Sequence, residues 1–330
     1  MPQHPALARA TAFCEHANAG GLGGCGALMM QPEAIRKWAA DVRAGTNGGF
    51  QFNLWIPDPP PKRDAAAESA MRDFLANWGP PVPPEAGNVV LPDFQTQCDA
   101  LLEASPAIVS SIMGLYPDRF VARMKTKRIK WFATVTTVSE AKTAERAGAD
   151  AIIAQGMEAG GHRSAFDVTQ AETRMVGLFS LISGVADAVV ATGGIADGRG
   201  IAAALVLGAS AVQIGTAFLR CPEAKISSAW ADAIGKAAPE DTVITRTMTG
   251  RPARSIATDY VCAAMAPTAP PPAPYPVQRG LTQPMREAAA KDNDVSRMQA
   301  WAGQSARLAR AEPASEVVQR LWQETQALLS

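Results

Sequence analysis

The sequence predicts an α/β protein built as a (β/α)8 TIM barrel, and two observations support this fold class. The 330 residues suit one such barrel with an appended segment. Short apolar stretches alternate with longer stretches of helical periodicity, as expected for βα units around a parallel sheet. The repeat of about 20 to 30 residues per unit is that of this barrel.

Seven short apolar stretches are predicted to be barrel strands. A closed barrel of this class needs eight, so one strand is missing from the visible pattern. In chain order the seven are residues 21–29, 50–56, 107–115, 129–137, 151–155, 188–192 and 211–218.

The stretches between these strands have helical periodicity. The predicted helices are 32–44, 117–127, 138–147, 169–183 and 198–207. Residues 58–84 are rich in proline and charge, and are predicted to form an excursion that is partly helical around 65–77.

The C-terminal part differs in composition. The segment "APTAPPPAPYPVQRG", residues 266–280, contains too much proline for regular structure and is predicted to run extended. Residues 285–311 and 313–329 have helical periodicity and should pack on the outside of the barrel. We therefore expect a barrel domain over 1–265, and a proline-rich connection with C-terminal helices over 266–330.

Composition limits the class of partner. Hydrophobic residues make up 47% of the chain and 31 basic residues balance 31 acidic ones, so no overall field favours nucleic acid or an anionic membrane. The five cysteines are scattered, and none is in a C-x-x-C spacing, which argues against a disulfide framework and a structural metal site. With no membrane span and no signal-peptide pattern, the expectation is a cytoplasmic protein that binds a small molecule.

The first glycine cluster, "GLGGCG" at residues 21–26, satisfies the G-x-G-x-x-G pattern of dinucleotide-binding loops. Such a loop should follow an apolar strand, whereas the residues before this one have helical character over 6–18. A glycine-rich barrel strand is therefore favoured over a dinucleotide site.

The second glycine cluster lies in residues 188–218 and predicts the last two barrel strands with their following loops. In such barrels these loops commonly hold a phosphate on backbone N–H groups. Tight turns that need glycine explain any one of these residues, but explain the pair of adjacent loops less well. Gly193, Gly194, Gly215 and Thr216 are thus predicted to bind a phosphate monoester.

The stretch "AQGMEAGGHRSAF", residues 154–166, places one of only three histidines after two glycines at the end of a strand. A histidine in this position can face a bound ligand at close range. The alternative is a loop histidine that makes one hydrogen bond.

Taken together, these motifs resemble the nitronate monooxygenases, formerly called 2-nitropropane dioxygenases. The resemblance extends from about residue 5 to the C-terminus, and is carried by "NAGGLGGCGALMM", "FNLWIP", "AQGMEAGGHR", "TGGIADGRGIAAALVLGASAVQIGTAFL" and "WAGQSARLAR". It implies a TIM barrel with non-covalent FMN, whose phosphate binds the last two loops and whose ring covers the barrel mouth. His162 matches the family's active-site histidine, and the positions that match flavin contacts are Asn53, Gln155, Gly161, Gly193, Gly194, Gly215 and Thr216.

The resemblance implies oxidation of alkyl nitronates, and of nitroalkanes, by flavin and dioxygen to a carbonyl compound and nitrite. A neutral nitroalkane must first lose a proton from carbon, and His162 is the expected base. Two alternatives stay open at this point. One is an NAD(P)H-dependent flavin reductase acting on quinones or enoyl thioesters, and the other is an inactive remnant without flavin.

The chain departs from the family pattern in two places. Members usually begin with a strand similar to P-I-I-x-A-P-M, whereas this chain begins with residues that resemble the helix after that strand, so the missing strand is expected to be the first. Tyr275 and Trp230 match substrate-side positions, but nearby tyrosine and lysine positions are Arg279 and Gln283 here. The substrate and the oligomeric state are therefore left open.

Overall fold

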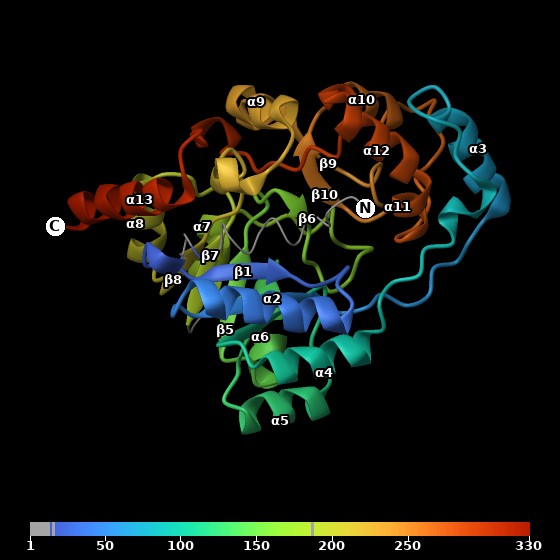
Figure 1. Cartoon of the computed structure of the whole chain (residues 1–330). Helices are drawn as coiled ribbons and strands as arrows, with labels where there is room; N and C mark the ends of the chain where they lie inside the picture. Colours follow the sequence, from blue (N-terminus) through green and yellow to red (C-terminus); the bar gives the residue numbers. More distant parts are fainter. Residues whose placement is uncertain (1–13, 15–16, 186–187) are drawn as a thin grey trace.

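A computed structural model describes residue 14 and residues 17–185 and 188–330, and shows a curled parallel sheet with helices on its outer face (Figure 1). The seven strands follow the order β1-β2-β3-β4-β5-β7-β8. Each lies within a predicted stretch, which confirms the TIM-barrel-like α/β fold. Their bounds are β1 Gly23–Gly26, β2 Phe50–Trp55, β3 Ile108–Ile112, β4 Lys130–Val135, β5 Ala151–Gln155, β7 Val189–Thr192 and β8 Ala211–Gln213.

Strand β2 shows how the sheet separates its two faces. Successive side chains of a strand point to opposite sides, so Phe52 points outward and packs on Trp38 of helix α2 (Pro32–Gly45), with ring centroids 4.9 Å apart. Gln51 points inward, and its Nε2 lies 3.4 Å from Oε1 of Gln213 on β8. The interior of the curled sheet is therefore crossed by polar side chains, and Asn53 and Trp55 share this inward face.

The sheet has two outer edges, β1 and β8. No further strand in the described part of the chain joins either edge. The predicted helical stretch 6–18 lies almost entirely outside the described residues and stays a prediction.

Helices follow most of the strands. The bounds are α2 Pro32–Gly45, α3 Ala65–Leu75, α4 Phe94–Ala104, α5 Asp118–Thr126, α6 Val138–Arg146, α7 Leu178–Gly184 and α8 Gly198–Val206. Within the described residues each predicted helical stretch between the strands contains a helix, and α4 is an additional one.

The prediction for residues 169–183 is wrong in its first half, because α7 begins only at Leu178. The Asp167 carboxylate accepts hydrogen bonds from the backbone N–H and the hydroxyl of Thr169. The guanidinium of Arg246 donates to the carbonyl of Val168 at 2.9 Å. These bonds hold the segment in turns instead of a helix.

A second, antiparallel sheet was not predicted. It consists of β6 Gly161–His162, β10 Ala253–Ile256 and β9 Thr242–Thr245, in that order across the sheet. Ala253 lies opposite His162. This sheet lies beside α9 to α12, as Figure 1 shows, and carries the histidine singled out by the sequence.

The C-terminal segments are mainly short helices. The bounds are α9 Ser228–Lys236, α10 Asp259–Ala264, α11 Val277–Leu281, α12 Gln283–Asp292 and α13 Ala314–Leu329. Residues 266–276 contain no helix or strand, as predicted, but α11 begins at Val277, inside the segment expected to be extended.

The prediction of a continuous helix over 285–311 is wrong beyond Asp292. Asn293 adopts a left-handed conformation with φ of 53°, which ends α12. Only short 3-10 turns follow before α13. Helix α13 then packs on α8, where the Glu324 carboxylate accepts the N–H of Gly198 at 2.9 Å.

The charged excursion after β2 packs against the C-terminal helices. Met71 and Leu75 of α3 share one buried apolar cluster with Tyr260 of α10 and Met285 of α12. Two segments about 200 residues apart in the chain are thus held together by burial of apolar surface. None of the helices described is long and apolar enough to span a bilayer.

Candidate functional site

The candidate site lies at the carboxyl ends of the parallel strands, where the second sheet lies beside the curled one. In barrels of this class the loops after the strands form the active site. Most of the residues predicted from the sequence lie on β2 and β5, on β6, which follows β5, or directly after β7 and β8, whereas Trp230 and Tyr275 come from later segments.

His162 is surrounded by aromatic rings from three distant segments. Its imidazole centroid lies 4.8 Å from the Trp55 ring and 5.3 Å from the Trp301 ring, both edge-on. The Tyr275 ring is 6.5 Å away and tilts against Trp55 at 5.2 Å. We call these three side chains, Trp55, Tyr275 and Trp301, the aromatic box.

The electrostatic surroundings keep this imidazole neutral. Burial in the aromatic box, together with the positive charges of Arg251 and Arg279, lowers the pKa of His162 to about 3. At neutral pH the ring therefore carries one proton and one free lone pair, as a base requires.

The two arginines differ in their partners. Arg251 is fully buried, forms an ion pair with Asp58 and donates to the carbonyl of Ala165 at 2.8 Å. The guanidinium of Arg279 has no ion pair or hydrogen bond within the described chain. It is close enough to contribute to the lowered pKa of His162, and to oppose in part the larger effect of burial on the pKa of Tyr275. Arg279 therefore offers a positive charge at the site that forms no ion pair with any carboxylate of the described residues.

Tyr275 supplies a second polar group. The residue is only 9% exposed, and its hydroxyl has no hydrogen-bond partner in the described part of the protein. Burial raises the pKa of Tyr275 to about 12, so the hydroxyl keeps its proton. A buried hydroxyl without a protein partner is available to a ligand.

Gln155, at the end of β5, is held in place by the histidine loop. Its Nε2 donates to the carbonyl of His162 at 3.1 Å, while its Oε1 accepts the N–H of Ser164 at 3.0 Å. Arg163, which is buried, donates to the same Oε1 at 3.2 Å. The structure thus joins two of the predicted residues, Gln155 and His162, through one hydrogen bond.

Two of the predicted glycines bring the loops after β5 and β7 into contact. Gly193 and Gly194 have φ of 111° and 72°, conformations that favour glycine. A Cβ at Gly193 would lie 3.0 Å from the N atom of Ala159, and one at Gly194 would lie 3.1 Å from Cβ of Glu158. The close approach of these loops therefore depends on the absence of side chains.

The remaining loop residues leave room beside these contacts. Thr216 accepts a hydrogen bond from the N–H of Gly303 at 3.0 Å, which ties the loop after β8 to the segment that carries Trp301. A Cβ at Gly161 or at Gly215 would meet nothing within 4 Å. Open space beside small residues, at the ends of the last two parallel strands, fits the phosphate and ring of a flavin.

Neither Asn53 nor Trp230 forms a hydrogen bond or ring contact with His162 in the described structure. Asn53 is on the inward face of β2, and its Nδ2 donates to the Ser110 hydroxyl at 3.0 Å. Trp230 packs in a separate apolar cluster that includes Ile234. No contact joins Trp230 to His162 among the residues described here, whereas Tyr275 does lie with His162.

Four site residues were not identified from the sequence: Trp55, Trp301, Arg251 and Thr249, whose hydroxyl lies 2.8 Å from Nε2 of His162. Both tryptophans occur inside motifs that carry the family resemblance, "FNLWIP" and "WAGQSARLAR". Those motifs were the available signal for them. Thr249 and Arg251 lie in a turn before β10, and only the long-range pairing of β10 with β6 brings them to the histidine.

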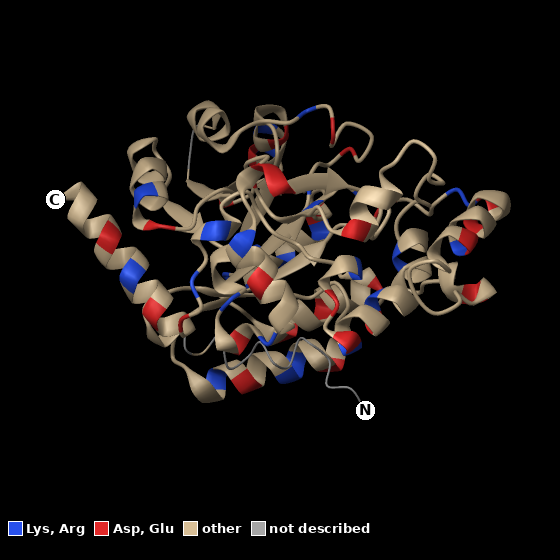
Figure 2. Cartoon of the chain, turned by 90° about the horizontal axis from the view of Figure 1, so that it is seen from above, with Lys and Arg blue, Asp and Glu red and all other residues tan. Residues whose placement is uncertain are grey.

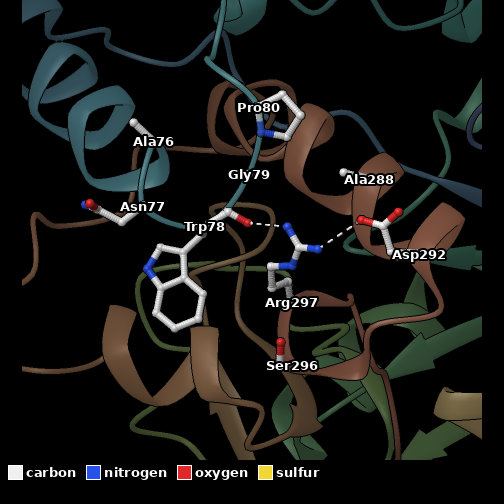
Figure 3. Close-up of a pocket in the computed structure, with 9 residues that line it drawn as sticks. All are labelled: Ala76, Asn77, Trp78, Gly79, Pro80, Ala288, Asp292, Ser296 and Arg297. Atoms are coloured by element: carbon white, nitrogen blue, oxygen red, sulfur yellow. Dashed lines mark hydrogen bonds and ion pairs between the residues drawn. The ribbon is translucent and has the colours of Figure 1, made fainter.

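A hollow in the described surface lies elsewhere. It has a volume of about 610 Å³ and is lined by residues between α3 and α12, including Trp78 and Arg297 (Figure 3). The Arg297 guanidinium is already bonded to the carbonyl of Trp78 at 2.8 Å and to Asp292 at 3.2 Å. This hollow therefore offers a ligand no free charge.

Charge and metal-ligand patterns add no competing site. Basic and acidic residues are interspersed along the ribbon, as Figure 2 shows. Within the described ranges no three His, Cys, Asp or Glu side chains gather closely enough to hold a metal ion.

Comparison with known proteins gives a consistent result. The family model described as nitronate monooxygenase matches residues 2–324. The chain is 38% identical to a nitronate monooxygenase of Paraburkholderia phytofirmans, over 97% of this chain and 88% of the relative. It is also 38% identical to one of Pseudomonas aeruginosa, over 97% and 92% of the two chains.

Solved structures agree with the sequence relatives. A crystal structure of a nitroalkane oxidase from Streptomyces ansochromogenes superposes with a TM-score of 0.88 at 32% identity, over 100% of this chain and 96% of that one. The structure of FabK from Thermotoga maritima superposes with a TM-score of 0.72 at 27% identity, over 100% and 91% of the two chains.

Proposed function

Since the chain belongs to the nitronate monooxygenase family, whose members are flavin-dependent oxidoreductases, we propose that it uses FMN and dioxygen to oxidise alkyl nitronates to a carbonyl compound and nitrite. Neutral nitroalkanes are substrates once a proton has been removed from carbon. The observation that carries this proposal is the neutral imidazole of His162 inside the aromatic box, beside loops that leave space for a flavin.

The loops after β7 and β8 support FMN as the particular flavin. Gly193, Gly194, Gly215 and Thr216 offer backbone N–H groups and one hydroxyl, which suit a single phosphate. When bound, a flavin would supply the redox chemistry between the nitronate and dioxygen. The protein would bind the phosphate, orient the flavin ring and accept the proton that the substrate loses.

His162 is assigned the role of base. A neutral imidazole has a lone pair free for a proton, and the anion that forms beside it favours the imidazolium, which opposes the lowering of the pKa by burial. The nitronate formed beside the imidazolium would be stabilised by the charge of the ring. Trp55 and Trp301 exclude water from this proton transfer.

Two further groups suit the nitro and nitronate oxygens. The hydroxyl of Tyr275 has no protein partner and can donate a hydrogen bond. The unpaired guanidinium of Arg279 favours the anionic nitronate over its neutral parent. Both groups act on an oxygen that gains negative charge as the proton leaves.

The test is an assay of the purified, flavin-loaded enzyme on a pre-formed nitronate. Oxygen uptake with release of nitrite is the expected result. Heat release of the flavin followed by chromatography should yield FMN, and FAD would contradict the monophosphate assignment.

The alternative functions give different results. Rapid bleaching of the bound flavin by NADH without oxygen, together with no nitrite from the nitronate, would support an NAD(P)H-dependent reductase. A colourless protein that takes up no flavin would indicate an inactive remnant.

A further inference from the structure

The hydroxyl of Thr249 is the only side-chain partner of the His162 ring nitrogens in the described structure. Its Oγ1 lies 2.8 Å from Nε2 of the imidazole, and the threonine is fully buried. The other ring nitrogen, Nδ1, has no hydrogen-bond partner among the described residues. The two nitrogens therefore have different surroundings, one held by protein and one open to a ligand.

The neighbours of Thr249 decide which way its own proton points. Oγ1 also lies 3.3 Å from the carbonyl oxygen of Arg251 and 3.4 Å from the N–H of the same residue. A hydroxyl has one proton to give and two lone pairs to accept with. If the proton goes to the carbonyl of Arg251, the two lone pairs accept from the N–H of Arg251 and from Nε2–H of His162.

The reverse arrangement leaves a group unsatisfied. If Thr249 donated to Nε2, the Arg251 carbonyl would lose the one hydrogen bond that the described structure gives it. Arg251 is fully buried, and an unpaired buried carbonyl is disfavoured. The first arrangement satisfies every partner of the hydroxyl.

The turn that carries Thr249 is anchored on both sides. The carbonyl of Thr247 accepts hydrogen bonds from the Tyr260 hydroxyl at 3.1 Å and from Gln278 at 2.8 Å. The carbonyl of Met248 accepts one from the Thr282 hydroxyl at 2.7 Å. Gly250, with φ of 87°, completes the turn where a Cβ would meet the carbonyl oxygen of Ala273 at 2.4 Å. Thr249 is therefore held on a rigid support.

We propose that Thr249 is a positioning residue that fixes His162 as the Nε2–H tautomer and leaves the lone pair of Nδ1 facing the substrate. In this role Thr249 acts through the histidine that its hydroxyl contacts. The catalytic meaning of this assignment rests on the proposed function, in which His162 is the base. The tautomer itself does not, because it is a property of the folded protein.

The tautomer can be observed directly by nitrogen NMR of the flavin-loaded enzyme with ¹⁵N-labelled histidine. The chain contains only three histidines, so comparison with His162→Asn assigns the relevant signals. The expected spectrum has a protonated Nε2 and an unprotonated Nδ1 on His162. A protonated Nδ1 in the wild-type enzyme would overturn the proposal, whether or not the enzyme oxidises nitronates.

Three variants separate positioning from structural support. Thr249→Val removes the hydroxyl at constant size, and should give a mixed tautomer signal with kcat on a neutral nitroalkane lowered about 10- to 100-fold, as for a displaced catalytic group. Thr249→Ser keeps the hydroxyl, and should show the wild-type tautomer signal and the wild-type kcat. Thr325→Val removes an equally buried hydroxyl on α13, which donates to the carbonyl of Leu321 at 2.7 Å, and should leave the His162 signals unchanged.

A Thr249→Val spectrum identical to that of the wild type would overturn the positioning role. If Thr249→Val does not fold, the wild-type spectrum and the Thr249→Ser variant still decide the tautomer.

Discussion

The imidazole of His162 lies edge-on to the indole of Trp55, with ring centroids 4.8 Å apart and an interplanar angle of 79°. The two residues are 107 positions apart in the chain and come from different sheets, β6 and β2. This contact removes water from one side of the histidine. Together with the nearby guanidinium groups of Arg251 and Arg279, it explains why the pKa of His162 falls to about 3.

The lowered pKa predicts how stability depends on pH. Between about 3 and 6.5 the unfolded chain holds a proton on residue 162 that the folded protein does not hold. The contribution of His162 to stability is therefore complete at pH values above its pKa in the unfolded chain. It is lost as the pH falls from about 6.5 toward 3. The slope attributable to this residue should approach about 1.4 kcal/mol per pH unit.

Unfolding of wild type and His162→Gln by denaturant, at matched saturating flavin and a series of pH values, measures this slope. The difference between the two proteins should grow in favour of the variant as the pH falls. A difference that is constant from pH 8 to pH 4 would show that His162 titrates normally in the fold.

Loss of the hydroxyl group should affect substrate binding at Tyr275 and stability at Tyr116. The Tyr275 hydroxyl has no partner in the described protein, so Tyr275→Phe should leave the free energy of unfolding unchanged. It should raise KM for a nitronate by about 10-fold or more, as expected for a lost hydrogen bond to a charged ligand.

Tyr116→Phe is the matched control. That hydroxyl is buried and donates to the carbonyl of Ser110 at 3.0 Å, so its loss should cost about 1 kcal/mol of stability with no change in KM. Steady-state kinetics and denaturant titrations of both variants provide the comparison. An unchanged KM in Tyr275→Phe would remove this tyrosine from the substrate site.

Gly215 tests the space assigned to the flavin. A Cβ at this position meets no protein atom within 4 Å, and the residue has φ of −113°, which alanine can adopt. Gly215→Ala should therefore fold normally but weaken flavin binding about tenfold or more, equivalent to at least about 1.4 kcal/mol.

Gly49→Ala is the control for this substitution. Gly49 precedes β2 at the opposite end of the sheet, and an added Cβ there makes only ordinary contacts, with the nearest atom at 3.4 Å. Fluorescence titration of both variants with FMN measures the two affinities. Equal affinities in the two variants would place the flavin away from the loop after β8.

The ion pair between Arg251 and Asp58 should matter more for stability than pairs on the surface. Arg251 is fully buried, and the Asp58 side chain is 24% exposed. Asp58→Asn leaves the guanidinium without its counter-charge, at a cost of about 2–3 kcal/mol once partial solvation of the aspartate is allowed for. Denaturant titration of the flavin-loaded enzyme checks this value.

Asp41→Asn breaks an exposed pair with Lys37 on α2 and should change stability by less than about 0.5 kcal/mol. If both variants lose the same amount, the burial of Arg251 has no energetic consequence.

The main sheet could be predicted from the sequence because its strands are short apolar runs in a regular repeat. Most of these runs are largely buried, with β8 as the exception, and a local pattern of this kind needs no knowledge of distant residues. The helix predictions failed where a local event ended the pattern. Asn293 stopped α12 in a left-handed conformation, and Asp167 held the segment before α7 in a turn.

The site was predictable only in part. Its histidine, glutamine and glycines follow strands directly, so their position in the sequence indicates their position in the barrel. The aromatic box and Thr249 could not be assembled in this way, because they meet through pairing of β6 with β10 and through the contact of Gly303 with Thr216. Contacts between residues this far apart in the chain have no local pattern.

The central claim is that His162 removes a carbon-bound proton at a flavin site, and one comparison of substrates tests it most directly. In His162→Asn, turnover of a neutral nitroalkane should fall by about 10²–10⁴, the usual contribution of a positioned general base. Turnover of the pre-formed nitronate, which needs no deprotonation, should fall much less. Equal losses on the nitroalkane and its nitronate would contradict the account, because the ring would then bind the anion without removing the proton.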